Sequence, residues 1–297
     1  MKFARVRTAD GTRPVVVAGE EAYDLSGLLG DLTPETMARL DEVAAAAADG
    51  RLDALELGRA VFEAPIGRPG AVLAIGMNYA AHAAESGSPP PPVPVMFLKT
   101  PNTVAAPDDP FVLPARARKL DWEVELALVM KKRAWELGPD DDPMDYVAGF
   151  TVADDISERT FQLEESGGQW SKGKCLPGST PLGPWLVTPD EVDPAGLRLR
   201  SFVNGEPRQD STTADMIFDV PTIIRHLSQY VALEPGDVVL TGTPEGVALS
   251  GRFPYLAGGD EVRIDIDELG IQTHRIVGAE RVAGAAPVLG ADRVVGA

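Results

Sequence analysis

The sequence has one cysteine, three histidines and comparatively few basic residues, and each shortage excludes a class of protein. A single cysteine, Cys175, can form neither an intramolecular disulfide nor a cysteine-rich zinc site. With only His82, His226 and His274 available, any metal site must be liganded mainly by oxygen. The 27 Lys and Arg against 45 Asp and Glu give a formal charge of −18, which argues against nucleic acid and anionic membranes as partners.

Long hydrophobic runs are also missing. No stretch approaches the roughly 18 apolar residues of a membrane-spanning helix, and Met1 to Arg13 is charged and lacks the apolar core of a signal peptide. We therefore expect a soluble cytoplasmic protein with no membrane partner. Its 297 residues, 44% of them hydrophobic, are enough to build a sizeable core.

Glycine and proline punctuate the chain at Gly67-Arg-Pro-Gly70, which we interpret as a domain boundary. Before it, strands at Lys2 to Arg7 and Pro14 to Val17 are joined by a hairpin turn. A helix follows Thr33-Pro34 and continues to Ala48. From Leu197 onward the pattern is mostly that of strands. The predicted units are a small α+β domain (residues 1–68), a larger, mainly β domain (69–280) and a tail without a motif (281–297).

The most informative stretch runs from Asp121 to Arg159. Glu123 and Glu125 alternate with apolar residues, so on a strand both glutamates share one face. An apolar run that begins at Val147 ends in Asp154-Asp155, which adds a third carboxylate. A divalent cation would offset the repulsion among these groups if they were buried. The alternative is a solvated strand face with both glutamates in water.

A second pattern is His82 with Glu85, three residues apart and therefore on one face of a helical turn. A carboxylate beside an imidazole raises its basicity and orients it, as a general base requires. The alternative is an ordinary surface pair. Pro89 to Pro92 predicts a hinge or the stem of a mobile loop. Lys174 lies in a glycine-flanked loop, where the pattern alone favours exposure over contact with an anionic substrate.

Taken together, seven motifs in a fixed order resemble the fumarylacetoacetate hydrolase family over about residues 70 to 280. They are Gly76-Met-Asn-Tyr79 with His82-Ala-Ala-Glu85, Phe97-Leu-Lys99, Asp121-Trp-Glu-Val-Glu-Leu126, Asp155-Ile-Ser-Glu-Arg159, Gly173-Lys174, Pro181-Leu-Gly-Pro-Trp185 and Thr241-Gly-Thr-Pro-Glu-Gly246. The chain looks most like the branch of acylpyruvases, 2,4-diketo acid hydrolases and 2-hydroxyhepta-2,4-diene-1,7-dioate isomerases.

The resemblance implies an α+β fold that is predominantly β, a mixed β-roll or barrel-like sandwich with flanking helices, in a homodimer. It also implies residue roles. The metal ligands would be Glu123, Glu125 and Asp155, holding Mg²⁺, with Mn²⁺ or Ca²⁺ as substitutes. The catalytic residues would be His82, Glu85 and Lys174, and the substrate-binding residues Tyr79, Lys99, Gln162 and Thr243. By this resemblance Asp155 rather than Asp154 would be the ligand, because the family uses the second residue of this pair.

The implied activity is a metal-dependent hydrolase that cleaves a C–C bond in a 2,4-diketo acid of the acylpyruvate kind. Water activated by His82 and Glu85 would attack, and the metal would hold the resulting enolate. Alternatives on the same site are an oxaloacetate-type decarboxylase and a 2-hydroxydienoate isomerase or tautomerase. An alternative of another class is a non-catalytic protein that binds an oxo acid or a cation. Three departures from the family pattern are Cys175 in place of serine, and acidic Asp154 and Glu158 in place of neutral residues.

Overall fold

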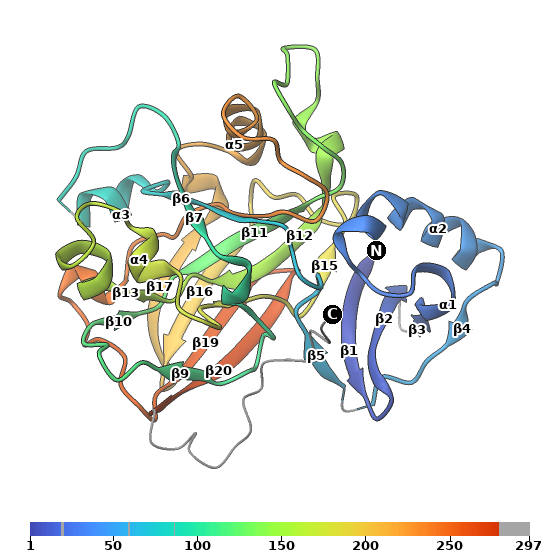
Figure 1. Ribbon diagram of the computed structural model, residues 1–297, viewed down its shortest axis with the longest axis horizontal. Helices are drawn as coiled ribbons and strands as arrows, with labels where there is room; N and C mark the ends of the chain where they lie inside the picture. Colours follow the sequence, from blue (N-terminus) through green and yellow to red (C-terminus); the bar gives the residue numbers. More distant parts are fainter. Residues whose placement is uncertain (19–20, 59, 86, 279–297) are drawn as a thin grey trace, which may run out of the picture.

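The computed structural model describes residues 1–18, 21–58, 60–85 and 87–278, so the predicted tail at 281–297 lies outside it. Two β-sheets packed face to face dominate the architecture, and the helices around them are short (Figure 1). This confirms the predicted α+β, predominantly β fold. Within the described residues the sheets stay open and do not close into a barrel.

In the described chain the larger sheet has eleven strands, in the order β4-β3-β2-β1-β15-β12-β11-β18-β6-β7, with β5 beside β1. Their bounds are β1 (Lys2–Thr8), β2 (Gly11–Ala18), β3 (Glu21–Asp24), β4 (Asp53–Ala54), β5 (Val61–Glu63), β6 (Val72–Gly76), β7 (Val95–Lys99), β11 (Val124–Met130), β12 (Val147–Asp154), β15 (Leu186–Val187) and β18 (Val238–Leu240). Most neighbours are antiparallel, but β18 pairs with β6 in parallel.

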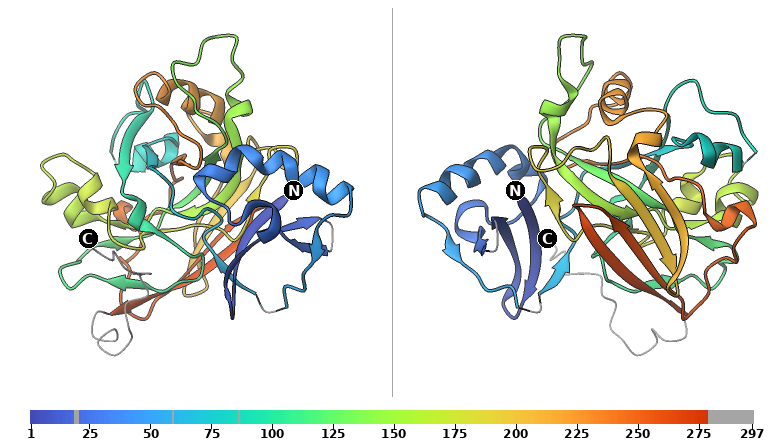
Figure 2. Two further views of the ribbon diagram at one scale, coloured as in Figure 1. Left: turned by 45° about the vertical axis from the view of Figure 1, so that its right-hand side comes forward. Right: turned by 180° about the vertical axis from the view of Figure 1, so that it is seen from behind.

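The smaller sheet has the order β17-β16-β19-β20-β9. The rear view in Figure 2 brings β16, β17, β19 and β20 to the front, in yellow to red. Its strands are β9 (Phe111–Leu113), β16 (Arg198–Val203), β17 (Glu206–Thr212), β19 (Glu261–Ile266) and β20 (Gly270–Gly278). Two short pairs join β10 (Leu120–Asp121) to β13 (Ser157–Glu158) and β8 (Val104–Ala105) to β14 (Thr180–Pro181). Asn204-Gly205 forms the turn between β16 and β17, with φ of 52° and 81° as a tight hairpin requires.

The helices are α1 (Ser26–Leu29), α2 (Leu40–Ala48), α3 (Ala80–Glu85), α4 (Ser171–Lys174) and α5 (Val220–Leu227). The helix expected after Thr33 begins as a 3₁₀ helix, η1 (Pro34–Arg39), and continues as α2. A π-helical turn, η4 (Thr160–Glu164), precedes α4. Asp219 caps α5 by accepting a hydrogen bond from the N–H of Thr222 at 2.9 Å. None of the helices in this part of the chain is long and apolar enough to cross a membrane.

Strands β11 and β12 lie at the centre and are buried on both faces. Val124 and Leu126 pack into a core shared with the smaller sheet, whereas Ala127 and Val129 face a second core that includes N-terminal residues. A strand covered on both faces has a continuous apolar sequence, which explains why the alternation seen up to Leu126 does not continue.

The N-terminal part extends the larger sheet. Strand β1 pairs with β15, with Phe3 opposite Leu186, and Figure 1 shows the blue N-terminal strands beside the yellow β15. Phe3 and Leu25 also belong to the same hydrophobic core as Ala127 and Val129. The sheet therefore runs without a break from residues 1–68 into the rest of the chain, and the boundary after residue 68 stays a prediction.

Candidate active site

The pairing of β11 with β12 brings three carboxylates together. Val124 lies opposite Asp154, so Glu123, Glu125 and Asp155 meet at one end of the hairpin. One ligand oxygen from each lies within 4.8 Å of the others. All three side chains are buried. The alternative of a solvated strand face is therefore wrong. The three residues could together hold a cation, and we call them the carboxylate cradle.

Two lysines lie against this carboxylate cradle. The Nζ of Lys174 donates to Oε2 of Glu123 at 2.5 Å and to Oδ2 of Asp155 at 2.7 Å. Lys99 contacts the other oxygen of Asp155 and donates to the carbonyl of Ser179 at 2.8 Å. Burial alone would lower the pKa of Lys174, but Asp155 and Glu123 raise it above its ordinary value. The lysine therefore stays charged.

Lys174 is only 2% exposed, so the exposure that its glycine-flanked position favoured is wrong. The reason is that α4 packs against β7 and η4. Gly173 permits this close approach, because a Cβ there would lie 2.4 Å from Cβ of Gln162 and 2.5 Å from its backbone nitrogen. Gly173 thus allows the close packing of α4 on η4, and Lys174 supplies a positive charge to the cradle.

Gly173→Ala is expected to destabilise the protein by about 1–3 kcal/mol, the usual cost of overpacking. The added methyl group would push α4 away from η4 and move Lys174 from Glu123. Urea unfolding and the affinity for Mg²⁺ would measure both effects. Gly196→Ala is the matched control, since no atom lies within 4 Å of a Cβ at that position. Equal stabilities of the two variants would contradict the prediction.

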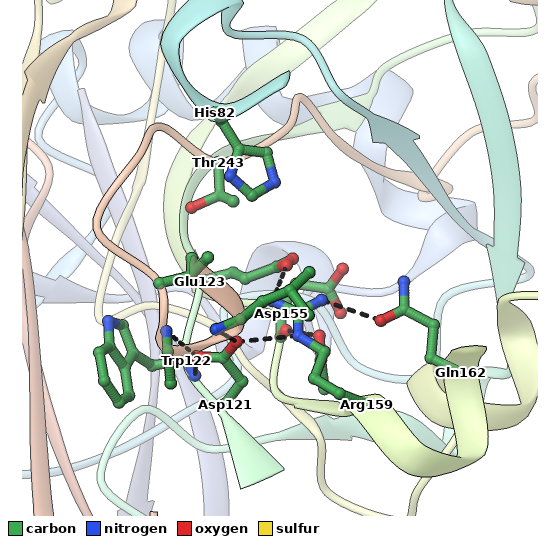
Figure 3. A network of polar contacts seen from close by, with 12 residues as sticks. His82, Asp121, Trp122, Glu123, Asp155, Arg159, Gln162 and Thr243 are labelled. Atoms are coloured by element: carbon green, nitrogen blue, oxygen red, sulfur yellow. Dashed lines mark hydrogen bonds and ion pairs between the residues drawn. The ribbon is translucent and has the colours of Figure 1, made fainter. Parts of the chain in front are cut away.

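Arg159 and Asp121 orient Glu123, a role that was not predicted from the motifs to which they belong. Arg159 donates to Oε1 of Glu123 at 2.6 Å, to Oδ2 of Asp121 at 2.8 Å and to Oε1 of Gln162 at 2.9 Å (Figure 3). Asp121 also accepts the backbone N–H groups of Ala248 and Leu249 at 2.8 and 3.0 Å. The one sequence signal for this role was that Asp121 belongs to one of the seven motifs and Arg159 to another.

Glu125 differs from its neighbours because no lysine or arginine of the described chain contacts its carboxylate. Its hydrogen bond comes from the N–H of Gly242 at 2.7 Å. Burial, then the charges of Asp155 and Glu123, raise the pKa of Glu125 well above its ordinary value. Burial also opposes ionisation of Glu123, but Lys174 and Arg159 lower its pKa to about 2. One carboxylate of the cradle thus lacks a counter-charge, and a divalent cation fits this donor set.

His82 and Glu85 face the cradle across a cavity of about 270 Å³. His82 Nδ1 lies 3.8 Å from Glu85 Oε2, and Glu85 accepts the N–H of Gly246 at 3.0 Å. Burial would raise the pKa of Glu85, but contacts with His82 and Gly246 lower it below its ordinary value. His82 is 7% exposed, so the surface-pair alternative is wrong. Figure 3 shows its ring above Glu123 and beside Thr243.

The predicted substrate-binding residues divide into two groups. Gln162 and Thr243 line the cavity, as does Lys174. Lys99 and Tyr79 do not: Lys99 lies behind Asp155, and Tyr79 is packed in the core. Burial raises the pKa of Tyr79 well above its ordinary value. Their contacts with substrate stay predictions, while Lys99 has an evident role in supporting Asp155.

A buried pair lies behind the cradle. Asp154 accepts the backbone N–H of Glu123 at 2.8 Å, and its other oxygen lies 3.1 Å from Nε2 of His274. Both side chains are fully buried, and neither ring nitrogen of His274 makes a well-directed hydrogen bond within the described residues. The sequence had marked Asp154 only as the neighbour of a ligand. In the structure it anchors the backbone of Glu123.

Asp154→Asn and His274→Gln are each expected to destabilise the protein, and the double variant should recover part of the loss because two amides can pair. A coupling of about 0.5–3 kcal/mol is typical of contacting residues. Denaturant unfolding of the wild type, both single variants and the double variant measures it. Additive effects would show that the 3.1 Å contact contributes nothing.

Comparisons with known proteins find relatives of this chain. The family model "Fumarylacetoacetate (FAA) hydrolase C-terminal" matches residues 71–277. Bovine (Bos taurus) mitochondrial oxaloacetate tautomerase FAHD2A is 43% identical over 229 residues, 76% of this chain and 73% of that protein. The 2,4-didehydro-3-deoxy-L-rhamnonate hydrolase of Sphingomonas sp. (strain SKA58) is 40% identical over 281 residues, 93% of this chain and 96% of that one.

A solved structure has a similar fold: the maleylpyruvate hydrolase of Sphingobium sp. SYK-6, in complex with manganese(II) and pyruvate. It aligns with a TM-score of 0.77 and 31% identity, over 94% of this chain and 99% of that one. The family match and the two sequence relatives confirm the resemblance drawn from the motifs. The chain therefore belongs to the fumarylacetoacetate hydrolase family.

Proposed function

We propose that the protein is a divalent-cation-dependent hydrolase that cleaves a C–C bond in a 2,4-diketo acid, giving a pyruvate-type 2-oxo acid and a second carboxylic acid. The observation that carries the proposal is the placement of the carboxylate cradle and the His82–Glu85 pair on one cavity. A relative that is named a hydrolase and aligns with 93% of this chain supports it.

The cation would be held by Glu123, Glu125 and Asp155, and we propose Mg²⁺, with Mn²⁺ or Ca²⁺ as substitutes. Carboxylate oxygens suit all of these hard cations. When bound, the cation supplies Lewis acidity and a template for the carboxylate and adjacent keto oxygen of a 2-oxo acid. The manganese in the complex of the maleylpyruvate hydrolase is consistent with such a site.

Each side chain of the cavity then has its own role in the reaction. The imidazole of His82 takes a proton from water, and ionised Glu85 stabilises the imidazolium that forms. Hydroxide adds to the C4 carbonyl, the C3–C4 bond breaks, and its electron pair passes to C3 as an enolate. Lys174, on the cavity wall, offsets this negative charge. Protonation at C3 completes the 2-oxo acid, while the acyl part leaves as a carboxylic acid.

The test is a product profile. Acylpyruvates are incubated with the purified protein in Mg²⁺ and, separately, in chelator. The proposal expects stoichiometric pyruvate and acid with Mg²⁺ and a large loss of rate without it. Turnover that is unchanged by chelator would contradict the cation-dependent mechanism.

A second candidate is oxaloacetate tautomerisation, which is favoured by the tautomerase that is 43% identical to the chain. It predicts interconversion of keto and enol forms at unchanged mass. Release of CO₂ would instead identify a decarboxylase, and binding of oxalate without turnover of any substrate would identify a non-catalytic binder.

A further inference from the structure

The cavity has an apolar wall in addition to its polar groups. We give the name apolar wall to the apolar residues larger than glycine among those that line the cavity: Ile75, Met77, Phe97, Leu163, Trp170 and Leu249. Trp170 is fixed in place by its neighbours: its ring meets that of Phe97 edge-on with centroids 5.8 Å apart. It also lies so close to Gly76 that a Cβ there would be 2.4 Å from the indole. These contacts hold Trp170 in a defined position on the wall.

The cations of the cavity are already engaged. Arg159 uses Nε, Nη1 and Nη2 on Asp121, Gln162 and Glu123. Lys174 lies between Glu123 and Asp155. Among the described residues that line the cavity, these two are the permanently charged cations. A negatively charged group on the substrate's tail therefore has no unengaged cation among these lining residues with which to pair.

Charge balance leads to the same conclusion. Three carboxylates on the lining, Glu85, Glu123 and Glu125, stand against the two cations, which leaves one negative charge. A divalent cation changes this to one positive charge, and the carboxylate of a 2-oxo acid neutralises it. Buried Asp121 makes the surroundings more negative still. A second carboxylate would be desolvated without a counter-charge among the lining residues, which is costly. Arg252, outside the lining, already faces Glu85 at 3.8 Å. The formal charge of −18 also repels dianions on approach.

We propose that the enzyme is selective for monocarboxylate 2,4-diketo acids with a neutral, mainly apolar tail beyond C4, and that it discriminates against those with a second carboxylate. This inference rests on the proposed function, since it names the substrate class of the same site. The apolar wall receives the tail, and the cradle with its cation receives the single carboxylate.

Two 2,4-diketo acids with tails of equal length, one ending in a methyl group and one in a carboxylate, test the proposal. The neutral tail is expected to give a kcat/KM about 10- to 100-fold higher, as for burying one uncompensated polar group. Cleavage of the dicarboxylate at an equal or higher kcat/KM overturns the tail selectivity and leaves the hydrolase function standing. If neither is cleaved, the hydrolase function fails, and calorimetric binding of the same two acids in Mg²⁺ still decides the selectivity.

A substitution designed to reverse the substrate selectivity gives a second test. Leu163 lies on the wall and is 48% exposed, so a longer polar side chain is tolerated there. Leu163→Arg is expected to raise kcat/KM for the dicarboxylate about 10-fold and to lower that for the neutral tail, because it removes one apolar contact and adds a charge. Leu163→Gln controls for polarity without charge. If the arginine and glutamine variants treat the dicarboxylate alike, the missing counter-charge is not what excludes it.

Discussion

Glu125→Gln is expected to stabilise the metal-free protein and, at the same time, to lower its affinity for Mg²⁺ by more than 100-fold. The buried carboxylate has no lysine or arginine against it in the described chain, and its pKa is raised well above the ordinary value. Glutamine keeps the shape, retains an oxygen for the N–H of Gly242 and removes the uncompensated charge. Loss of a ligand weakens binding beyond the roughly 10- to 100-fold typical of outer-shell changes.

The pH dependence has a definite sign. Because the pKa of Glu125 is higher in the folded state, its contribution to the stability of the metal-free protein is complete at low pH and is lost as pH rises through the folded pKa. The advantage of Glu125→Gln in chelator should therefore grow with pH and reverse when Mg²⁺ is added. Thermal unfolding at several pH values, with chelator and with Mg²⁺, measures this.

Glu123→Gln is the matched control, with the opposite effect on the metal-free protein. A pKa lowered from 4.5 to about 2 corresponds to about 3 kcal/mol of stability that is present above pH 4.5 and lost as pH falls toward 2. The substitution should thus destabilise the protein at neutral pH, because Arg159 and Lys174 lose their carboxylate. Both variants should bind Mg²⁺ poorly. Equal and destabilising effects of the two substitutions in chelator would refute the charge assignment.

His82→Gln is expected to lower kcat for C–C cleavage by about 100- to 10,000-fold, the range for removing a general base. Cation binding should change little, because His82 lies on α3 and the cradle lies on the hairpin of β11 and β12. Pyruvate affinity in Mg²⁺, measured by calorimetry, should also be nearly unchanged. The experiment thus separates chemistry from binding.

His226→Gln is the control, because this histidine lies on α5, outside the cavity lining, and packs against Tyr230 with tilted rings whose centroids are 5.0 Å apart. It should keep both activity and binding. A His82→Gln variant that still cleaves substrate within about 10-fold of wild type would remove the residue from the role of base. Loss of pyruvate binding together with activity would indicate a structural role instead.

The sequence predicted the local parts of the site and missed the parts built by distant packing. Alternation placed Glu123 and Glu125 on one face, and an apolar run led to Asp155, because both patterns lie within single strands. The burial of Lys174 was missed because it depends on α4 meeting β7 and η4. Likewise, no local pattern links Asp121 to the amides of Ala248 and Leu249.

The N-terminal part illustrates the same limit. Its strands and turn were evident from the residue pattern, and β1 and β2 form as predicted. Phe3 and Leu186 are far apart in the sequence. Their pairing depends on the core that they share, and no motif predicts it.

The three carboxylates of the cradle come from one antiparallel hairpin, whereas His82 and Glu85 come from a single short helix. Under the proposed function, anchorage of a 2-oxo acid and activation of water would be encoded in separate segments of the chain. Substitutions in α3 would then be expected to redirect the reaction while the hairpin continues to hold the same kind of ligand. Such a division favours the divergence of new activities on one scaffold, and relatives named as a tautomerase and a hydrolase share this chain's sequence at 40–43% identity.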